Sequence, residues 1–153
     1  MALRSIILGL AASLLFAAPG HADQKADLAV EVFKSPNCGC CGNWVKHMQG
    51  QGFKVTANNV EYSILTRIKR QAGIKEEFAS CHTAKIGGYV IEGHVPAEDV
   101  KRLLAEKPDA KGLVVPGMPI GSPGMEMGNE KEAYEVLLVK KDGSTEVFAR
   151  HGQ

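Results

Sequence analysis

Apolar and polar residues in the first half of the chain alternate with the period of a strand, then a helix, then a strand and a helix again. Residues 28–33 (LAVEVF) predict a strand, and residues 42–49 predict a helix with apolar positions at helical spacing. Residues 53–60 (FKVTANNV) predict a second strand and residues 63–72 (SILTRIKRQA) a second helix. Two strands joined by so short a helix are expected to pair in parallel, with a right-handed crossover.

The second half has a different pattern, dominated by turn residues. Residues 83–95 contain two β-rich runs around a Gly-Gly turn, which predicts a hairpin. Residues 96–106 open with proline and two acids, as expected at a helix start. Residues 111–129 are rich in Gly, Pro and Met and predict a long loop, and residues 134–140 and 144–150 predict a C-terminal hairpin around an Asp-Gly turn.

The order strand, cysteine-rich turn, helix, strand, helix, hairpin, helix predicts the fold class. It is typical of an α/β thioredoxin-like fold, here with a Met/Pro/Gly-rich loop and a C-terminal β-hairpin appended. Residues 23–153 have the size of one ordinary domain with a modest core. We therefore expect a single domain over 23–153.

The first 22 residues have the pattern of a secretory signal peptide. Arg4 is their only charge, residues 6–18 form an apolar run, and residues 19–22 supply a helix breaker followed by small residues. A membrane anchor is the alternative, but the apolar run is short against the roughly 20 residues that a membrane-spanning helix needs. The prediction is an exported, periplasmic protein that begins near Asp23, with no membrane attachment after cleavage.

The net charge of the mature chain bears on its possible partners. Without Arg4, the 18 Lys and Arg residues fall to 17, which balances the 17 Asp and Glu residues. A net charge of zero does not favour nucleic acid or an anionic membrane surface as a partner.

The candidate chemistry lies in the stretch SPNCGCCGNW, which holds Cys38, Cys40 and Cys41 at the predicted start of the first helix. A helix N-terminus favours thiolates, which act as nucleophiles and as metal ligands. Cys38 and Cys41 have the C-x-x-C spacing of thiol–disulfide oxidoreductases, so that function is one alternative.

Two features favour a metal site over a dithiol enzyme. Cys40 is surplus to a dithiol mechanism, and Cys81 falls in the segment where thioredoxins carry a cis-proline against the active-site sulfurs. In the predicted fold Cys81 therefore faces the other three cysteines, and four converging thiols suit a soft metal ion. A single Zn²⁺ ion held by four thiolates remains an alternative. Another alternative is a small secreted domain stabilised by two disulfides.

Histidines and methionines extend the candidate ligand set. His82 adjoins Cys81, and His94 lies toward the end of the same hairpin, so both are candidate ligands, whereas His47 is expected at the surface. Thioethers are soft ligands suited to Cu(I), although methionine also fills irregular gaps in packing. The predicted loop contributes three candidate thioethers: Met118, Met125 and Met127. Lys69 and its basic neighbours are expected on a solvated helix face.

The segments SPNCGCCGNWVKHM, SCHTAKIGGYVIEGHVP and GLVVPGMPIGSPGMEMG together resemble the CopG family of exported bacterial copper-resistance proteins, over nearly all of the mature chain. The resemblance implies a thioredoxin-like fold whose cysteines hold a bridged cluster of several Cu(I) ions. The implied ligands are Cys38, Cys40, Cys41 and Cys81. A sulfur shared between two Cu(I) ions would explain why three thiols stand so close together.

The predicted function is sequestration of Cu(I) in copper resistance, with cycling between Cu(I) and Cu(II) as an added role. The expected partners are copper ions, more than one per chain, and other periplasmic copper-handling proteins. The pattern favours a metal-binding protein over an enzyme. The alternative is a thiol–disulfide oxidoreductase that uses Cys38 and Cys41.

Overall fold

The computed structural model describes residues 28–152, so the predicted signal peptide lies outside the described residues. The seven strands are β1 (Ala29–Lys34), β2 (Lys54–Asn59), β3 (His82–Ile86), β4 (Tyr89–Glu92), β5 (Ala110–Val114), β6 (Tyr134–Lys140) and β7 (Thr145–His151). The helices are α1 (Gly39–Gly50), α2 (Tyr62–Gln71), α3 (Ala97–Glu106) and a short 3-10 turn, η1 (Glu76–Phe78). The predicted mixed α/β class is confirmed.

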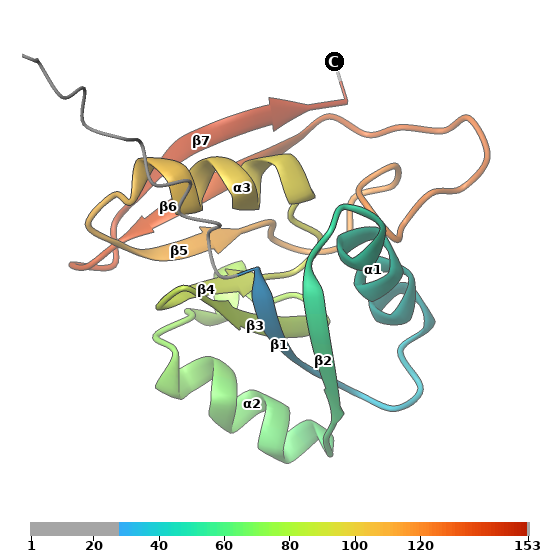
Figure 1. The fold of residues 1–153 in the computed structure, drawn as a ribbon, viewed down its shortest axis with the longest axis horizontal. Helices are drawn as coiled ribbons and strands as arrows, with labels where there is room; N and C mark the ends of the chain where they lie inside the picture. The colour runs from blue at the N-terminus through green and yellow to red at the C-terminus, as the bar shows by residue number, and fades with distance from the viewer. Residues whose placement is uncertain (1–27, 153) are drawn as a thin grey trace, which may run out of the picture.

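All seven strands form one sheet in the order β2-β1-β3-β4-β5-β6-β7 (Figure 1). The predicted parallel pairing of β1 with β2 across α1 is confirmed, and so are the antiparallel hairpins β3-β4 and β6-β7. β3 pairs antiparallel with β1, which places the start of β3 beside the end of β1.

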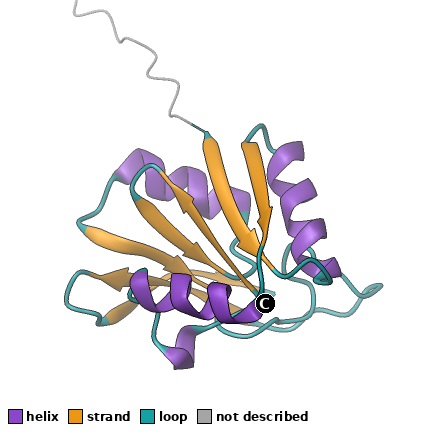
Figure 2. Ribbon diagram, turned by 90° about the horizontal axis from the view of Figure 1, so that it is seen from below, coloured by secondary structure: helices purple, strands orange, loops and turns teal. Residues whose placement is uncertain are grey.

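Helices cover both faces of the sheet (Figures 1 and 2). α1 and α3 bury their apolar sides in the main core, where Trp44 is fully buried and its Nε1 donates to the Val95 carbonyl at 2.9 Å. α2 lies against the opposite face, where Lys69 reaches Thr83 of β3. The faces alternate along the strands because successive side chains of a strand point to opposite sides.

The structure corrects the predicted loop over residues 111–129. Its first residues belong to β5, which pairs parallel with β4 and antiparallel with β6. Gly112 interrupts the β pattern in the sequence, yet it is required here, because a Cβ at that position would lie 1.7 Å from the Val90 carbonyl oxygen. A glycine inside a strand often marks such a close backbone approach.

The structure also corrects the solvated position that the sequence predicts for Lys69. Lys69 is only 8% exposed, and its Nζ forms an ion pair with the buried Glu92 of β4 at 2.5 Å. Arg67, two residues earlier on α2, is exposed as predicted. The sequence pattern could not distinguish the two because the partner carboxylate comes from a strand 23 residues away.

The long segment between β5 and β6 folds back onto α1. A Cβ on Gly124 would lie 2.7 Å from the Cys40 carbonyl oxygen and from the Trp44 amide nitrogen, so the loop backbone touches the first turns of that helix. Among residues 28–152, no helix has the length and apolar character needed to cross a membrane.

Candidate metal centre

Three of the four cysteines lie at the N-terminus of α1. This helix begins at Gly39 and not at Gly42, so Cys40 and Cys41 fall inside its first turn and Cys38 caps it. The Cys38 sulfur accepts a hydrogen bond from the Cys41 amide at 3.3 Å. Sequence reasoning placed the start too late because glycine and cysteine carry no helical apolar periodicity.

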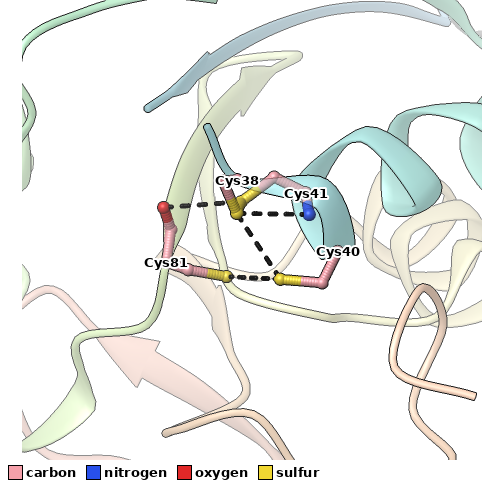
Figure 3. A group of neighbouring side chains, drawn as sticks. All are labelled: Cys38, Cys40, Cys41 and Cys81. Atoms are coloured by element: carbon pink, nitrogen blue, oxygen red, sulfur yellow. Dashed lines mark hydrogen bonds between the residues drawn. A yellow bond between two sulfur atoms is a disulfide. The ribbon is translucent and has the colours of Figure 1, made fainter. Parts of the chain in front are cut away.

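Cys38 and Cys41 are joined by a disulfide, whereas Cys40 and Cys81 are free (Figure 3). The Cys40 sulfur bridges the two segments, at 3.4 Å from the Cys38 sulfur and 3.8 Å from the Cys81 sulfur. Cys41 is fully buried, while Cys38, Cys40 and Cys81 are partly exposed. The predicted convergence of Cys81 on the other three cysteines is thus present in the structure.

Sheet pairing explains why Cys81 arrives there. His82, the first residue of β3, pairs with Lys34, the last residue of β1. The residue before β3 and the turn after β1 therefore share one edge of the sheet. Burial, followed by the nearby Cys40, raises the pKa of the Cys81 thiol to about 12, so a cation that binds there must displace a proton.

The donor set fits a soft metal ion. One sulfur from each of the four cysteines lies within 4.8 Å of the others. A tetrahedral ion about 2.3 Å from each thiolate would hold neighbouring sulfurs about 3.8 Å apart. The distances to Cys40 are close to that value, but all four thiolates become available only when the Cys38–Cys41 disulfide is reduced.

The structure brings both candidate histidines to Cys81. His94 Nε2 lies 3.1 Å and His82 Nδ1 lies 3.7 Å from the Cys81 sulfur, and both rings are fully buried. His47, which was expected at the surface, is half-buried, and its Nε2 accepts a hydrogen bond from the Ala97 amide at 3.2 Å.

The three loop methionines are more exposed than the two buried histidines. Met118 is 50% exposed and Met127 is 57% exposed, whereas Met125 is partly buried. Met118 and Met127 are therefore too exposed for the gap-filling alternative, whereas the partly buried Met125 is compatible with it. Their role as copper ligands stays a prediction.

A polar network beneath Cys81 was missed by sequence reasoning. The Glu92 carboxylate accepts hydrogen bonds from the Ser80 amide and from the Thr83 hydroxyl, both at 2.7 Å, besides its ion pair with Lys69. Burial raises the pKa of Glu92, and Lys69 opposes that rise. The network holds the Ser80 backbone and the Thr83 side chain, one on either side of Cys81. The one signal in the sequence was a glutamate ending an apolar strand.

Solvent reaches Cys38 and Cys81 through a cleft of about 770 Å³. Cys38 and Cys81 lie in its wall, and the side chains of Tyr62 and Leu65 on α2 and of Ile74 after it supply apolar surface. Tyr62 is 78% exposed, so the cleft has an open aromatic edge.

Fold and site define a mixed α/β protein with four cysteines gathered at a helix N-terminus. Two solved structures named copper resistance protein CopG match this chain. Form 2 matches with 44% identity and a TM-score of 0.75, covering 80% of this chain and 97% of that one. Form 1 matches with 42% identity and a TM-score of 0.77, covering 83% and 99%. The chain belongs to the CopG copper-resistance family, as the sequence motifs indicated.

A second comparison is consistent with this assignment. The family model described as a protein of unknown function, DUF411, matches residues 78–125, which include Cys81, His94 and the start of the long loop. Among curated proteins, none matches the chain.

Proposed function

We propose that this protein binds Cu(I) through the thiolates of Cys38, Cys40, Cys41 and Cys81 and sequesters it in copper resistance. The observation that carries the proposal is the approach of four sulfur atoms to within 4.8 Å of one another from two distant segments. Thiolates are soft ligands that select Cu(I), and family membership supports copper as the cargo. Sulfurs shared between ions would let the four cysteines hold more than one Cu(I) per chain.

Loading depends on the redox state of the cysteines. Reduction of the Cys38–Cys41 disulfide takes two electrons and two protons and yields two thiols, which then release their protons when copper binds. The partly exposed Cys38 is the sulfur of this pair that lies in the cleft. The oxidised protein retains only two free thiols, so it should hold less copper than the reduced protein.

A second candidate function is thiol–disulfide exchange through Cys38 and Cys41. The disulfide between them, at the N-terminus of α1, favours this alternative.

The element order β1-α1-β2-α2-β3-β4-α3 supports a thioredoxin-like core, which we include in the proposal. Copper cycling between Cu(I) and Cu(II) is an extension of the same site.

The proposed setting is the periplasm, after removal of residues 1–22. The charged, apolar and small-residue pattern of that segment supports export. Intact-mass measurement of protein expressed with its own leader should find a chain that begins within a few residues of Asp23 in periplasmic extract. A mass that retains residues 1–22 in a membrane fraction would refute this localisation.

A copper titration tests the function. Anaerobically reduced protein, titrated with Cu(I) against a competing chelator, is expected to bind more than one ion per chain, and the disulfide form fewer. Preference for a single Zn²⁺ ion would favour the mononuclear alternative. Efficient insulin reduction without copper binding would favour the oxidoreductase.

A further inference from the structure

The cleft beside the Cys38–Cys41 disulfide has the dimensions of a ligand site. Its walls are the side of α2 that carries Tyr62 and Leu65 and the segment over residues 74–81. Its volume of about 770 Å³ falls within the range of about 300–1,000 Å³ that is usual for small-molecule sites. The cleft is therefore large enough for a ligand of the size of a short peptide.

The disulfide is open to attack from this cleft at one of its two sulfurs. Cys41 is fully buried, whereas Cys38 is partly exposed and lies in the cleft wall. A thiolate breaks a disulfide by attacking one sulfur and displacing the other, so it needs access to the sulfur that it attacks. A thiol that enters the cleft therefore meets Cys38, and Cys41 is the group that it displaces.

The surroundings of Cys41 suit a displaced sulfur. Cys41 lies in the first turn of α1, and the partial positive charge of a helix N-terminus stabilises a thiolate. The Cys81 carbonyl oxygen lies 3.7 Å from the Cys41 sulfur, so it can accept a hydrogen bond from the Cys41 thiol once that thiol is protonated.

The charged side chains of the cleft are mostly positive. Lys69, Arg70 and Lys75 line it, against the single acid Glu76. The charge of Lys69 is already balanced by the ion pair with Glu92. Arg70 is exposed, and no carboxylate within residues 28–152 forms an ion pair with its guanidinium group. The cleft therefore favours an anionic ligand.

Two further contacts leave this positive charge available. Lys75 meets Glu77 at 3.6 Å, but the two side chains are 56% and 63% exposed, and such surface pairs contribute little. Arg67 and Arg70 together line an adjoining hollow on α2. A ligand that approaches the cleft over α2 thus passes three cationic side chains.

We propose that this cleft binds a low-molecular-weight thiol that carries carboxylate groups, and that this thiol reduces the Cys38–Cys41 disulfide. The apolar wall takes the body of the ligand, Arg70 and Lys75 attract its carboxylates, and its sulfur reaches Cys38. The proposal rests on the proposed function, because it names the reductant that prepares the cysteines for Cu(I). The cleft admits a small thiol and not a protein disulfide, which separates this role from the oxidoreductase alternative.

The reaction consumes two thiols for each disulfide. The first thiolate forms a bond to the Cys38 sulfur, the Cys38–Cys41 bond breaks, and Cys41 leaves as a thiolate. A second thiolate attacks the sulfur of the bound ligand, which departs as a small disulfide and releases the Cys38 thiolate. Two electrons pass from the two small thiols to the chain, and their two protons end on Cys38 and Cys41.

Three monothiols of similar size and different charge test the cleft: 3-mercaptopropionate is anionic, 2-mercaptoethanol is neutral and cysteamine is cationic. Metal-free protein in the disulfide form is mixed with each thiol and quenched by alkylation. Intact mass then counts the free cysteines, which rise from two, Cys40 and Cys81, to four. Each variant is compared with wild type for the same thiol, so the intrinsic reactivities of the thiols cancel.

The double variant Arg70→Gln/Lys75→Gln removes the proposed anion contacts. At low salt it is expected to slow reduction by 3-mercaptopropionate roughly fivefold and to leave reduction by 2-mercaptoethanol within a factor of about two. Lys54→Gln is the matched control and should change no rate, since Lys54 is exposed and pairs with the start of β1, whereas Cys38 follows the end of that strand. An undiminished rate with the anionic thiol, or an equal loss with all three thiols, would overturn the proposal.

An unreactive ligand tests binding apart from chemistry. S-methylglutathione is an acidic peptide whose blocked sulfur cannot attack a disulfide. At millimolar concentration it should slow the reduction of wild type by 3-mercaptopropionate at least about twofold, and it should inhibit the double variant much less. Absence of inhibition, or equal inhibition of both proteins, would refute the site. No copper is present in these measurements, so their failure is distinguishable from failure of the Cu(I) titration of chemically reduced protein.

Discussion

The sulfur atoms of Cys40 and Cys81 lie 3.8 Å apart, although 41 residues separate the two cysteines. β3 runs antiparallel to β1, so the residue before β3 meets the helix that follows β1. Copper bound between them would tie the N-terminus of α1 to the central sheet. Binding and stability should therefore be coupled at these two residues.

Cys81→Ser should remove most of the stability that copper adds. A ligand that binds only the native state adds ~2.7 kcal/mol at a hundredfold excess over its dissociation constant. For a domain of this size that corresponds to a rise in Tm of roughly 10 °C. We expect this rise in reduced wild type and less than half of it in Cys81→Ser, measured by thermal melting with and without Cu(I).

The metal-free melting temperatures of both proteins serve as the control for folding. An equal copper-dependent rise in the two proteins would exclude Cys81 as a ligand. Insulin reduction should be negligible in both, since the site is expected to bind metal and not to exchange disulfides.

Cys40→Ser should lower the copper content without disturbing the fold. Cys40 is partly exposed and takes no part in the disulfide, so its loss leaves the core and the Cys38–Cys41 pair intact. Reduced Cys40→Ser is expected to bind no more than one Cu(I) per chain, where wild type binds more than one. Metal analysis after anaerobic gel filtration gives both numbers, and an unchanged copper content would show that Cys40 is not a bridging ligand.

Lys69→Met should destabilise the protein strongly. Removing one partner of a buried ion pair typically costs about 3–5 kcal/mol because the other charge stays buried and unpaired. The side chains of Lys69 and Glu92 are 11% and 0% exposed, so this range applies here. The free energy of unfolding in urea measures the loss.

Two matched variants complete that experiment. Arg67→Met changes an exposed residue of the same helix and should stay within about 0.5 kcal/mol of wild type. Adding Glu92→Gln to Lys69→Met should recover much of the loss, because the unpaired charge is then absent. Equal effects of Lys69→Met and Arg67→Met would mean that the buried ion pair contributes little.

Gly124→Ala should loosen the loop from α1. Gly124 has a φ of +88°, and an added Cβ would lie 2.7 Å from backbone atoms of Cys40 and Trp44. The left-handed conformation alone costs a residue with a Cβ about 1–2 kcal/mol, and the backbone contact adds to that cost. Gly128→Ala is the control, since its φ is +61° with no atom within 4 Å of the added Cβ. We expect Gly124→Ala to lower Tm clearly more than Gly128→Ala, and equal shifts would show that the loop contact is weak.

The sequence by itself determined most of the secondary structure. The strand at residues 28–33, the helix at 63–72 and the C-terminal hairpin were predicted to within one residue, and the hairpin at 83–95 to within three, because apolar period and turn residues are local signals. The same local signals put three cysteines at the start of a helix. The family resemblance then named all four cysteines together.

Only the tertiary structure decided which distant groups contact Gly112, Lys69 and His94. β5 was missed because Gly112 breaks its pattern, and the approach of the β4 backbone that requires this glycine exists only in the folded sheet. Lys69 looks like its solvated neighbours until β4 brings Glu92 beneath it. Likewise, the lone pair of His94 points at Cys81 because the distant carbonyl of Pro123 holds the opposite nitrogen. Each of these contacts joins segments that are remote in the chain, so it depends on sheet pairing and loop docking that no local pattern encodes.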